Sequence, residues 1–153
     1  MTTPFVFTFN LRRSVFQHLG LSLFNHLTQL RLHSGKLILL PIVNNLADGV
    51  DVRAEAIRQQ LPPLLEAHGA SKCHLISYSI SGIDARYALS KLGVDAHAST
   101  LTTIATPHLG SRLAWLAERQ VIADKHSEAI ARLLGVGLRP FWEMTPENMH
   151  YFN

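Results

Sequence analysis

The sequence predicts an α/β fold, a three-layer sandwich in which helices cover a mostly parallel β-sheet. Short apolar segments that suit strands alternate along the chain with segments of helical periodicity. In addition, residues 37–43 (LILLPIV) are almost continuously apolar, as expected of a strand buried on both faces of a sheet. Strands that alternate with helices pair in parallel and are joined by right-handed crossovers, with helices on both faces.

The first half of the chain predicts two strands and two helices. Residues 4–9 (PFVFTF) form a strand, and residues 14–32 carry an apolar stripe at helical spacing. The strand at 37–43 contains Pro41, which indicates an edge or a strand end, because proline has no N–H for the ladder. Asp48 can cap a helix that runs to about Leu61. Two consecutive prolines follow it, so a second short helical turn is expected at 62–69.

The second half predicts two more strands and two more helices. A strand at 72–77 leads into a helix at 80–92, and Gly93 stands where a C-terminal cap is expected. Residues 98–104 form the next strand, followed by a loop at 106–110. Residues from 112 to about 134 are mostly helical. At 153 residues, the chain is expected to form one domain.

The composition excludes several classes of protein. Hydrophobic residues make up 47% and charged residues 16%, as in globular proteins, and the longest apolar run is too short for an integral membrane segment. The net charge of +3 is spread without a basic stripe, so no nucleic-acid partner is expected. The nine histidines and the single Cys73 show no metal-ligand spacing, and no dinucleotide-binding glycine motif follows a strand, so no metal and no cofactor are expected.

The residue distribution bears on location in the cell. A single cysteine cannot form an internal disulfide and fits a reducing, intracellular compartment. No acidic residue precedes Asp48, whereas Arg12, Arg13, Arg31 and Lys36 do. An acid-free, basic start is one property of organellar transit peptides, which makes a mitochondrial location one alternative. An ordinary first strand and helix is the favoured interpretation.

Ser79 stands between the predicted strand at 72–77 and the predicted helix at 80–92. In a nucleophile elbow, this sharp strand–turn–helix junction exposes a serine at the carboxyl end of a strand, with amides of the next helix facing a developing oxyanion. The turn needs small residues two positions before and two after the serine. Here these are Ser77 and Ser81, followed by Gly82. A small-x-Ser-x-small pattern is common by chance. The prediction of a nucleophile elbow therefore depends on the position of Ser79 between a predicted strand and a predicted helix.

Two segments carry a resemblance to a known family. HLISYSISGIDARYALSKLG resembles the lipase pattern NLIGHSMGGLDARYLISKL, and LTTIATPHLGSRLAWL resembles VTTIGTPHRGSxFADW. Both patterns belong to the bacterial and fungal triacylglycerol lipases, which include the fungal mitochondrial lipases and have the α/β-hydrolase fold. VRAEAIRQQL and FWEMTPENMHYFN are similar to two further segments of the family. The resemblance runs from about residue 36 to residue 153 and implies that residues 1–153 form a single, incomplete α/β-hydrolase domain, the N-terminal part of that fold.

By this resemblance, Ser79 is the catalytic nucleophile, and the backbone N–H groups of Ile80 and Leu11 are the oxyanion donors. The sequence departs from the family at several of these places. Ser77 and Ser81 replace the usual glycines, and Tyr78 replaces the usual histidine. The family's His-Gly-Leu oxyanion loop corresponds here to the Phe-Asn-Leu at residues 9–11.

The family's catalytic acid and histidine follow the final FN motif, so the chain is expected to be truncated before both. His108 and His150 are weak candidates for a replacement base, with structural roles favoured for each. Asp124 and His126 are imaginable partners, but two residues apart on a predicted helix they point to different faces. Asp84 and Arg86 are expected to have a structural role, as an ion pair or a hydrogen-bond anchor near the helix after Ser79. Trp115 and Trp142 are expected to pack in the fold, and an acyl-binding surface is the alternative for these two residues.

Two functions remain open at this stage. The first is a lipase-like serine ester hydrolase acting on acyl glycerols or related carboxylic esters, with peripheral lipid contact. The second is a catalytically incomplete homologue or gene fragment that binds lipid or a protein partner. An incomplete sheet would also expose an edge after the strand at 98–104, which favours self-association.

Overall fold

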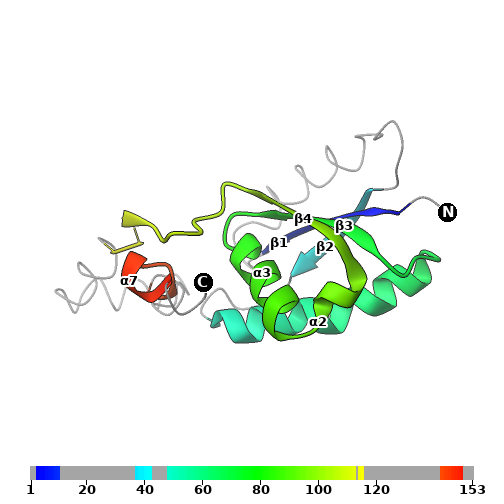
Figure 1. The fold of residues 1–153 in the computed structure, drawn as a ribbon, viewed down its shortest axis with the longest axis horizontal. Helices are drawn as coiled ribbons and strands as arrows, with labels where there is room; N and C mark the ends of the chain where they lie inside the picture. The colour runs from blue at the N-terminus through cyan, green and yellow to red at the C-terminus, as the bar shows by residue number, and fades with distance from the viewer. Residues whose placement is uncertain (1–2, 11–36, 43–47, 113, 116–141, 150–153) are drawn as a thin grey trace.

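The computed structural model describes residues 3–10, 37–42, 48–112, 114–115 and 142–149. Its strands and helices follow the predicted alternation (Figure 1). In chain order they are β1 (Phe5–Asn10), β2 (Leu37–Ile42), α2 (Val50–Ala67), β3 (Cys73–Tyr78), α3 (Ser81–Lys91), the 3-10 helix η1 (Val94–His97), β4 (Ala98–Ile104) and α7 (Pro146–Met149).

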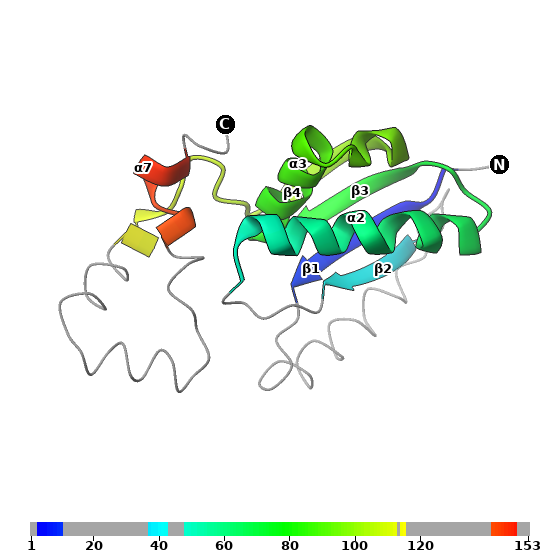
Figure 2. The same ribbon diagram turned by 90° about the horizontal axis from the view of Figure 1, so that it is seen from below.

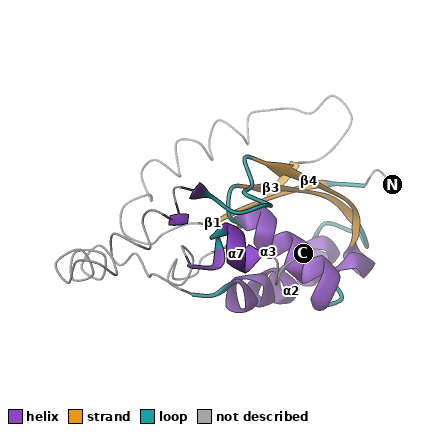
Figure 3. Ribbon diagram, turned by 60° about the vertical axis from the view of Figure 1, so that its left-hand side comes forward, coloured by secondary structure: helices purple, strands orange, loops and turns teal. Residues whose placement is uncertain are grey.

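The four described strands form one sheet in the order β2-β1-β3-β4, and every neighbouring pair is parallel. Helices α2 and α3 lie side by side against one face of this sheet (Figures 1 and 3). The predicted parallel α/β fold is thus confirmed. The helix expected at 14–32 lies outside the described residues, as does most of the one expected at 112–134.

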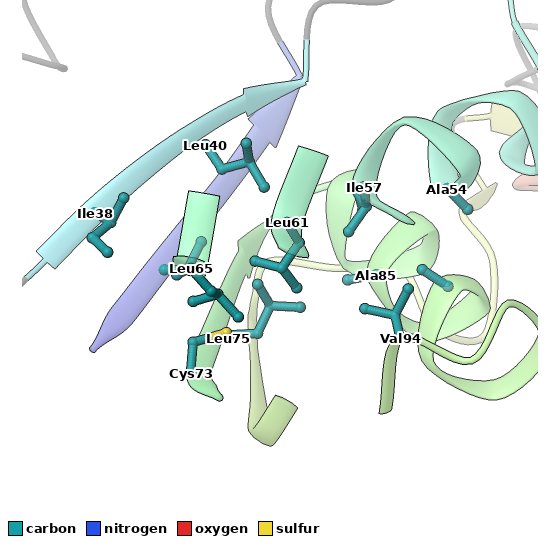
Figure 4. Close-up of a cluster of buried hydrophobic side chains, with 12 residues drawn as sticks. Ile38, Leu40, Ala54, Ile57, Leu61, Leu65, Cys73, Leu75, Ala85 and Val94 are labelled. Atoms are coloured by element: carbon teal, nitrogen blue, oxygen red, sulfur yellow. The ribbon is translucent and has the colours of Figure 1, made fainter. Parts of the chain in front are cut away.

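The hydrophobic core lies between the sheet and the two helices (Figure 4). Side chains alternate along β3, so every second one points into this core. Helix α2 contributes residues three or four positions apart, which form one apolar face. The buried members of the core are Val6, Ile38, Leu40, Ala54, Ile57, Leu61, Leu65, Cys73, Leu75, Ala85, Ala88 and Val94.

The predicted break after Leu61 is wrong, because α2 continues as one helix through Pro62 and Pro63 to Ala67. A proline removes the hydrogen bond to the carbonyl four residues earlier. Those carbonyls belong to Arg58 and Gln59, two exposed residues, so water can replace the lost bonds. The opposite face of the helix is held in the core. The helix also begins after Gly49, one residue later than the predicted cap at Asp48.

Other boundaries agree with the sequence. Gly93 has a left-handed φ of 73° directly after the C-cap of α3, a conformation that glycine adopts without a steric penalty. Strand β2, which contains Pro41, is an edge of the described sheet, as the proline predicted. Strand β4 spans the predicted residues and is the other edge of the described sheet, the feature on which the expected self-association rests.

Among the described helices, none combines the length and the apolar character needed to cross a membrane.

Candidate active site

Ser79 lies in the turn that joins the carboxyl end of β3 to α3. Its φ of 56° is in the left-handed region, which is unfavourable for a residue with a Cβ and is found where surrounding structure enforces it. The Ser79 N–H donates to the carbonyl of Ile104, at the end of β4, over 2.8 Å. A strained serine at a strand–turn–helix junction is the backbone geometry of a nucleophile elbow.

Ser79 also lies at the position where the sheet's strand order reverses. Strand β1 is followed in the chain by β2 on one side, and the chain then returns to place β3 on the other side of β1. In open parallel sheets, ligands bind at such a switch point, outside the carboxyl ends of the strands. Thr8 pairs with Ser77 in the register of β1 and β3, so both strands end at the same edge. Leu11, the second expected oxyanion donor, follows β1 and lies outside the described residues.

Ser77 and Ser81, the small residues two positions before and after Ser79, are both fully buried. The hydroxyl of Ser77 is hydrogen-bonded to that of Thr8 over 2.7 Å, which links β3 to β1. The Ser81 hydroxyl has no hydrogen-bond partner among the described residues. A serine side chain therefore fits at both positions, and the hydroxyl is hydrogen-bonded at Ser77.

At Gly82, α3 and the loop after β4 approach each other closely. A Cβ built at Gly82 would lie 2.1 Å from Oγ1 of Thr106, which is closer than a Cβ approaches a non-bonded atom. This close approach brings the Thr106 hydroxyl within 2.8 Å of the Ser79 carbonyl, to which it donates a hydrogen bond. The segment at 104–106 therefore contacts the elbow at both the N–H and the C=O of Ser79. The sequence did not indicate a role for Thr106 beyond its presence in the second family-like segment.

The N–H groups of Ile80 and Ser81 precede the first hydrogen-bonded turn of α3. Within the described residues, neither has a backbone or side-chain acceptor. The first amides of a helix carry a partial positive charge and bind anions. Among the described residues, the expected oxyanion donor at Ile80 is therefore without an acceptor.

His108 is held through both ring nitrogens. Arg86 Nη1 lies 2.9 Å from Nδ1, and Thr103 Oγ1 lies 2.9 Å from Nε2. Because a guanidinium only donates, Nδ1 accepts this bond, and Nε2 carries the ring proton and donates it to Thr103. Burial, and then the nearby Arg86 charge, lower the pKa of His108 below its ordinary value. This arrangement is that of a neutral histidine anchoring the loop to α3. The other base candidate, His150, lies outside the described residues, as do Asp124 and His126.

Asp84 forms a buried ion pair with Arg53 of α2. Arg53 Nε donates to both carboxylate oxygens of Asp84, over 3.0 and 3.1 Å, and its Nη2 lies 3.0 Å from Oδ1. Asp84 was expected to anchor the elbow helix, and it does so with a partner that the sequence did not indicate. This ion pair ties the first turn of α3 to the first turn of α2.

Glu143 completes this buried ion cluster from a distant part of the chain. Its Oε2 lies 3.3 Å from Arg53 Nη2, and both its oxygens accept the Val50 N–H, over 3.0 and 3.1 Å. A carboxylate at this place satisfies an orphan N–H at the start of α2 and complements the helix dipole. Figure 2 shows the segment that carries it, next to α7, beyond the carboxyl ends of the strands. Arg53, Asp84 and Glu143 each belong to a family-like segment of the sequence, which was the available signal for this cluster.

Apolar side chains are exposed beside the elbow. Tyr78 and Ile104, the last pair in the register of β3 and β4, are 48% and 45% exposed, and Leu109 in the following loop is 81% exposed. Trp142 is 48% exposed, whereas Trp115 is partly buried. In the described part of the chain, no three His, Cys, Asp or Glu side chains cluster in a way that could hold a metal ion.

No family model matches the sequence. Among solved structures, the chain is similar to the Bacillus licheniformis lipase BlEst2, with a TM-score of 0.66 and 19% identity to the mature form, and 0.69 and 21% to the propeptide form. It is also similar to the phospholipase PlaB from Legionella pneumophila, with a TM-score of 0.55 and 17% identity. These alignments cover 98%, 98% and 99% of this chain but 57%, 31% and 35% of the respective neighbours. The chain therefore has a three-layer α/β fold that is part of an α/β-hydrolase fold.

Proposed function

We propose that this chain is a lipase-like serine ester hydrolase of the bacterial and fungal lipase type, with Ser79 as its nucleophile. The observation that carries the proposal is the left-handed φ of Ser79 at the end of β3, directly before α3. A strained conformation of this kind persists only where the surrounding structure holds it, and such sites cluster where chemistry is done. Here three contacts with Ile104, Thr106 and Gly82 hold it.

In the proposed reaction, Ser79 Oγ attacks the ester carbonyl while its proton passes to a histidine. The tetrahedral intermediate places its negative oxygen against the N–H groups of Ile80 and Leu11. The alcohol then leaves with the proton, and water hydrolyses the acyl-enzyme by the same route in reverse. The Ile80 N–H, which has no acceptor among the described residues, supports the first donor, and the adjacent ends of β1 and β3 support the second.

The proposed substrates are acyl glycerols or related esters of apolar acids. The exposed Tyr78, Ile104 and Leu109 support this class, because two of them end β3 and β4 and the third follows in the next loop. Such a surface also suits peripheral contact with a lipid layer. The neighbours in fold, a lipase and a phospholipase by name, support the same class.

The base and the acid are assigned to no described residue. His108 can accept a proton at Nδ1 only by losing the Arg86 hydrogen bond, and the ring is already engaged at Nε2. In the described part of the chain, no histidine or carboxylate is hydrogen-bonded to Ser79. The engagement of both His108 nitrogens by Arg86 and Thr103 supports a second candidate function, a catalytically incomplete homologue that binds lipid or a protein partner.

Covalent labelling with a fluorophosphonate separates the two candidates. The folded chain, Ser79→Ala and Ser90→Ala are each incubated with the probe, and the modified residue is identified by mass spectrometry. Ser90 is an exposed serine of α3, eleven positions along the chain, and serves as the matched control. An activated nucleophile requires labelling at Ser79 that is lost in Ser79→Ala and retained in Ser90→Ala. A folded chain that is not labelled contradicts the hydrolase proposal and leaves the binding function.

A further inference from the structure

The carbonyl of Ser79 accepts two hydrogen bonds. Thr106 Oγ1 donates to it over 2.8 Å, and the Gly82 N–H donates over 3.1 Å. The second bond is an ordinary turn contact within the start of α3. The first comes from a different element, the loop after β4, and joins residues 27 positions apart. Thr106 therefore connects that loop to one specific peptide group of the elbow.

That peptide group also contains the Ile80 N–H. A trans peptide is planar, and its C=O and N–H point in opposite directions. A side chain that fixes the direction of the Ser79 carbonyl consequently fixes the direction of the Ile80 N–H. From this geometry we infer that Thr106 is a positioning residue for the Ile80 oxyanion donor. The inference rests on the proposed function, in which this N–H faces the developing oxyanion.

The local backbone places the Thr106 hydroxyl for this contact. Ala105 has a left-handed φ of 52°, which turns the chain directly after β4. The preceding residue, Ile104, accepts the Ser79 N–H, so residues 104–106 hold the elbow from both sides of Ser79. The absent Cβ at Gly82 leaves the space that the Thr106 side chain occupies. Two residues on, His108 ties the same loop to Arg86 of α3.

The same hydrogen bond affects donor strength as well as direction. A carbonyl that accepts a hydrogen bond polarises its peptide group, and the N–H of that group becomes a better donor. Catalysis by an oxyanion donor depends on its being oriented before the reaction begins. Removal of the Thr106 hydroxyl without a change in side-chain volume is therefore expected to slow the reaction at Ser79 about tenfold.

The test compares Thr106→Val, which has nearly the same shape without the hydroxyl, with Thr106→Ser, which retains it. Two quantities are measured on each full chain: the second-order rate constant for fluorophosphonate labelling of Ser79, and the NMR cross-peak that correlates the Ser79 carbonyl carbon with the Ile80 amide. Thermal unfolding midpoints show whether each variant is folded. We expect labelling to slow about tenfold in Thr106→Val and to recover in Thr106→Ser. The cross-peak should move in Thr106→Val and return toward its original position in Thr106→Ser.

Two results overturn the inference. One is a Thr106→Val chain that is labelled as fast as the original chain. The other is a Ser79–Ile80 cross-peak that Thr106→Val leaves in place. If the unaltered chain is not labelled at all, the proposed function fails separately. The cross-peak then decides by itself whether Thr106 orients this peptide group.

Discussion

Replacement of Arg53 by methionine tests the buried ion cluster that joins α2, α3 and the segment before α7. The Arg53 side chain is 1% exposed, and it lies against two carboxylates that are 0% and 5% exposed, those of Asp84 and Glu143. Methionine fills much of the same volume but leaves both carboxylates buried without their cation. Breaking a buried ion pair in this way costs about 3–5 kcal/mol. Domains are commonly stable by roughly 5–15 kcal/mol, so the variant should lose a large part of its free energy of unfolding.

The assay is urea unfolding followed by tryptophan fluorescence, together with thermal unfolding. At about 2–4 °C for each kcal/mol in a chain of this size, the midpoint of Arg53→Met should fall by roughly 6–20 °C. Arg58→Met is the matched control, because Arg58 lies on the same helix and pairs with Glu55 where both side chains are substantially exposed. Water screens that pair, so its loss should change the midpoint far less.

A further variant separates charge from packing. Arg53→Met combined with Asp84→Asn and Glu143→Gln removes the stranded charges, so it should recover part of the lost stability. The reasoning is refuted if Arg53→Met shifts the midpoint no more than Arg58→Met does. It is also refuted if the triple variant recovers nothing, because the loss would then come from packing rather than from uncompensated charge.

Two further predictions concern titratable groups. Burial raises the pKa of the Cys73 thiol to about 11, so a thiol reagent near neutral pH should modify this residue only after the chain unfolds. Rapid modification of the folded chain would contradict the position of Cys73 in the core. Burial and the nearby Arg86 charge lower the pKa of His108 on folding. As the pH falls below the unfolded pKa of about 6.5, the unfolded chain therefore binds a proton more readily than the folded chain, and the free energy of unfolding decreases. His108→Asn should remove this contribution, seen as a shallower pH dependence of the unfolding free energy below about pH 6.5, and equal slopes in the two chains would argue against it.

The sequence predicted most of the strands and helices because hydrophobic periodicity and glycine or proline positions act locally. Strand β4 and the glycine after α3 agree with the structure, and Ser79 lies at the predicted strand–turn–helix junction. The error at Pro62 has a tertiary cause. Local rules end a helix there, but contacts of Leu61 and Leu65 with the sheet hold one helix on both sides of the prolines.

Within the candidate site, the local pattern predicted roles for Ser79 and Ile80, because a nucleophile elbow is a short contiguous segment. It did not identify Thr106 as a contact of the Ser79 carbonyl, because that bond depends on how the loop after β4 approaches Gly82. His108, a weak candidate base from the sequence, lies in the predicted loop at 106–110. The hydrogen bonds that occupy its two nitrogens depend on α3 and β4 lying side by side.

The amino-acid sequence by itself determined the class of fold, the strand–turn–helix around Ser79 and the small residues that this turn requires. These properties follow from backbone preferences and periodicities within a few residues. Only the tertiary structure decided which side chains hold the elbow in place. Arg53, Asp84 and Glu143 meet from segments up to 90 residues apart, and Thr106 reaches the Ser79 peptide across 27. Side-chain contacts of this kind depend on the packing of whole helices against the sheet, which no local stretch of sequence encodes.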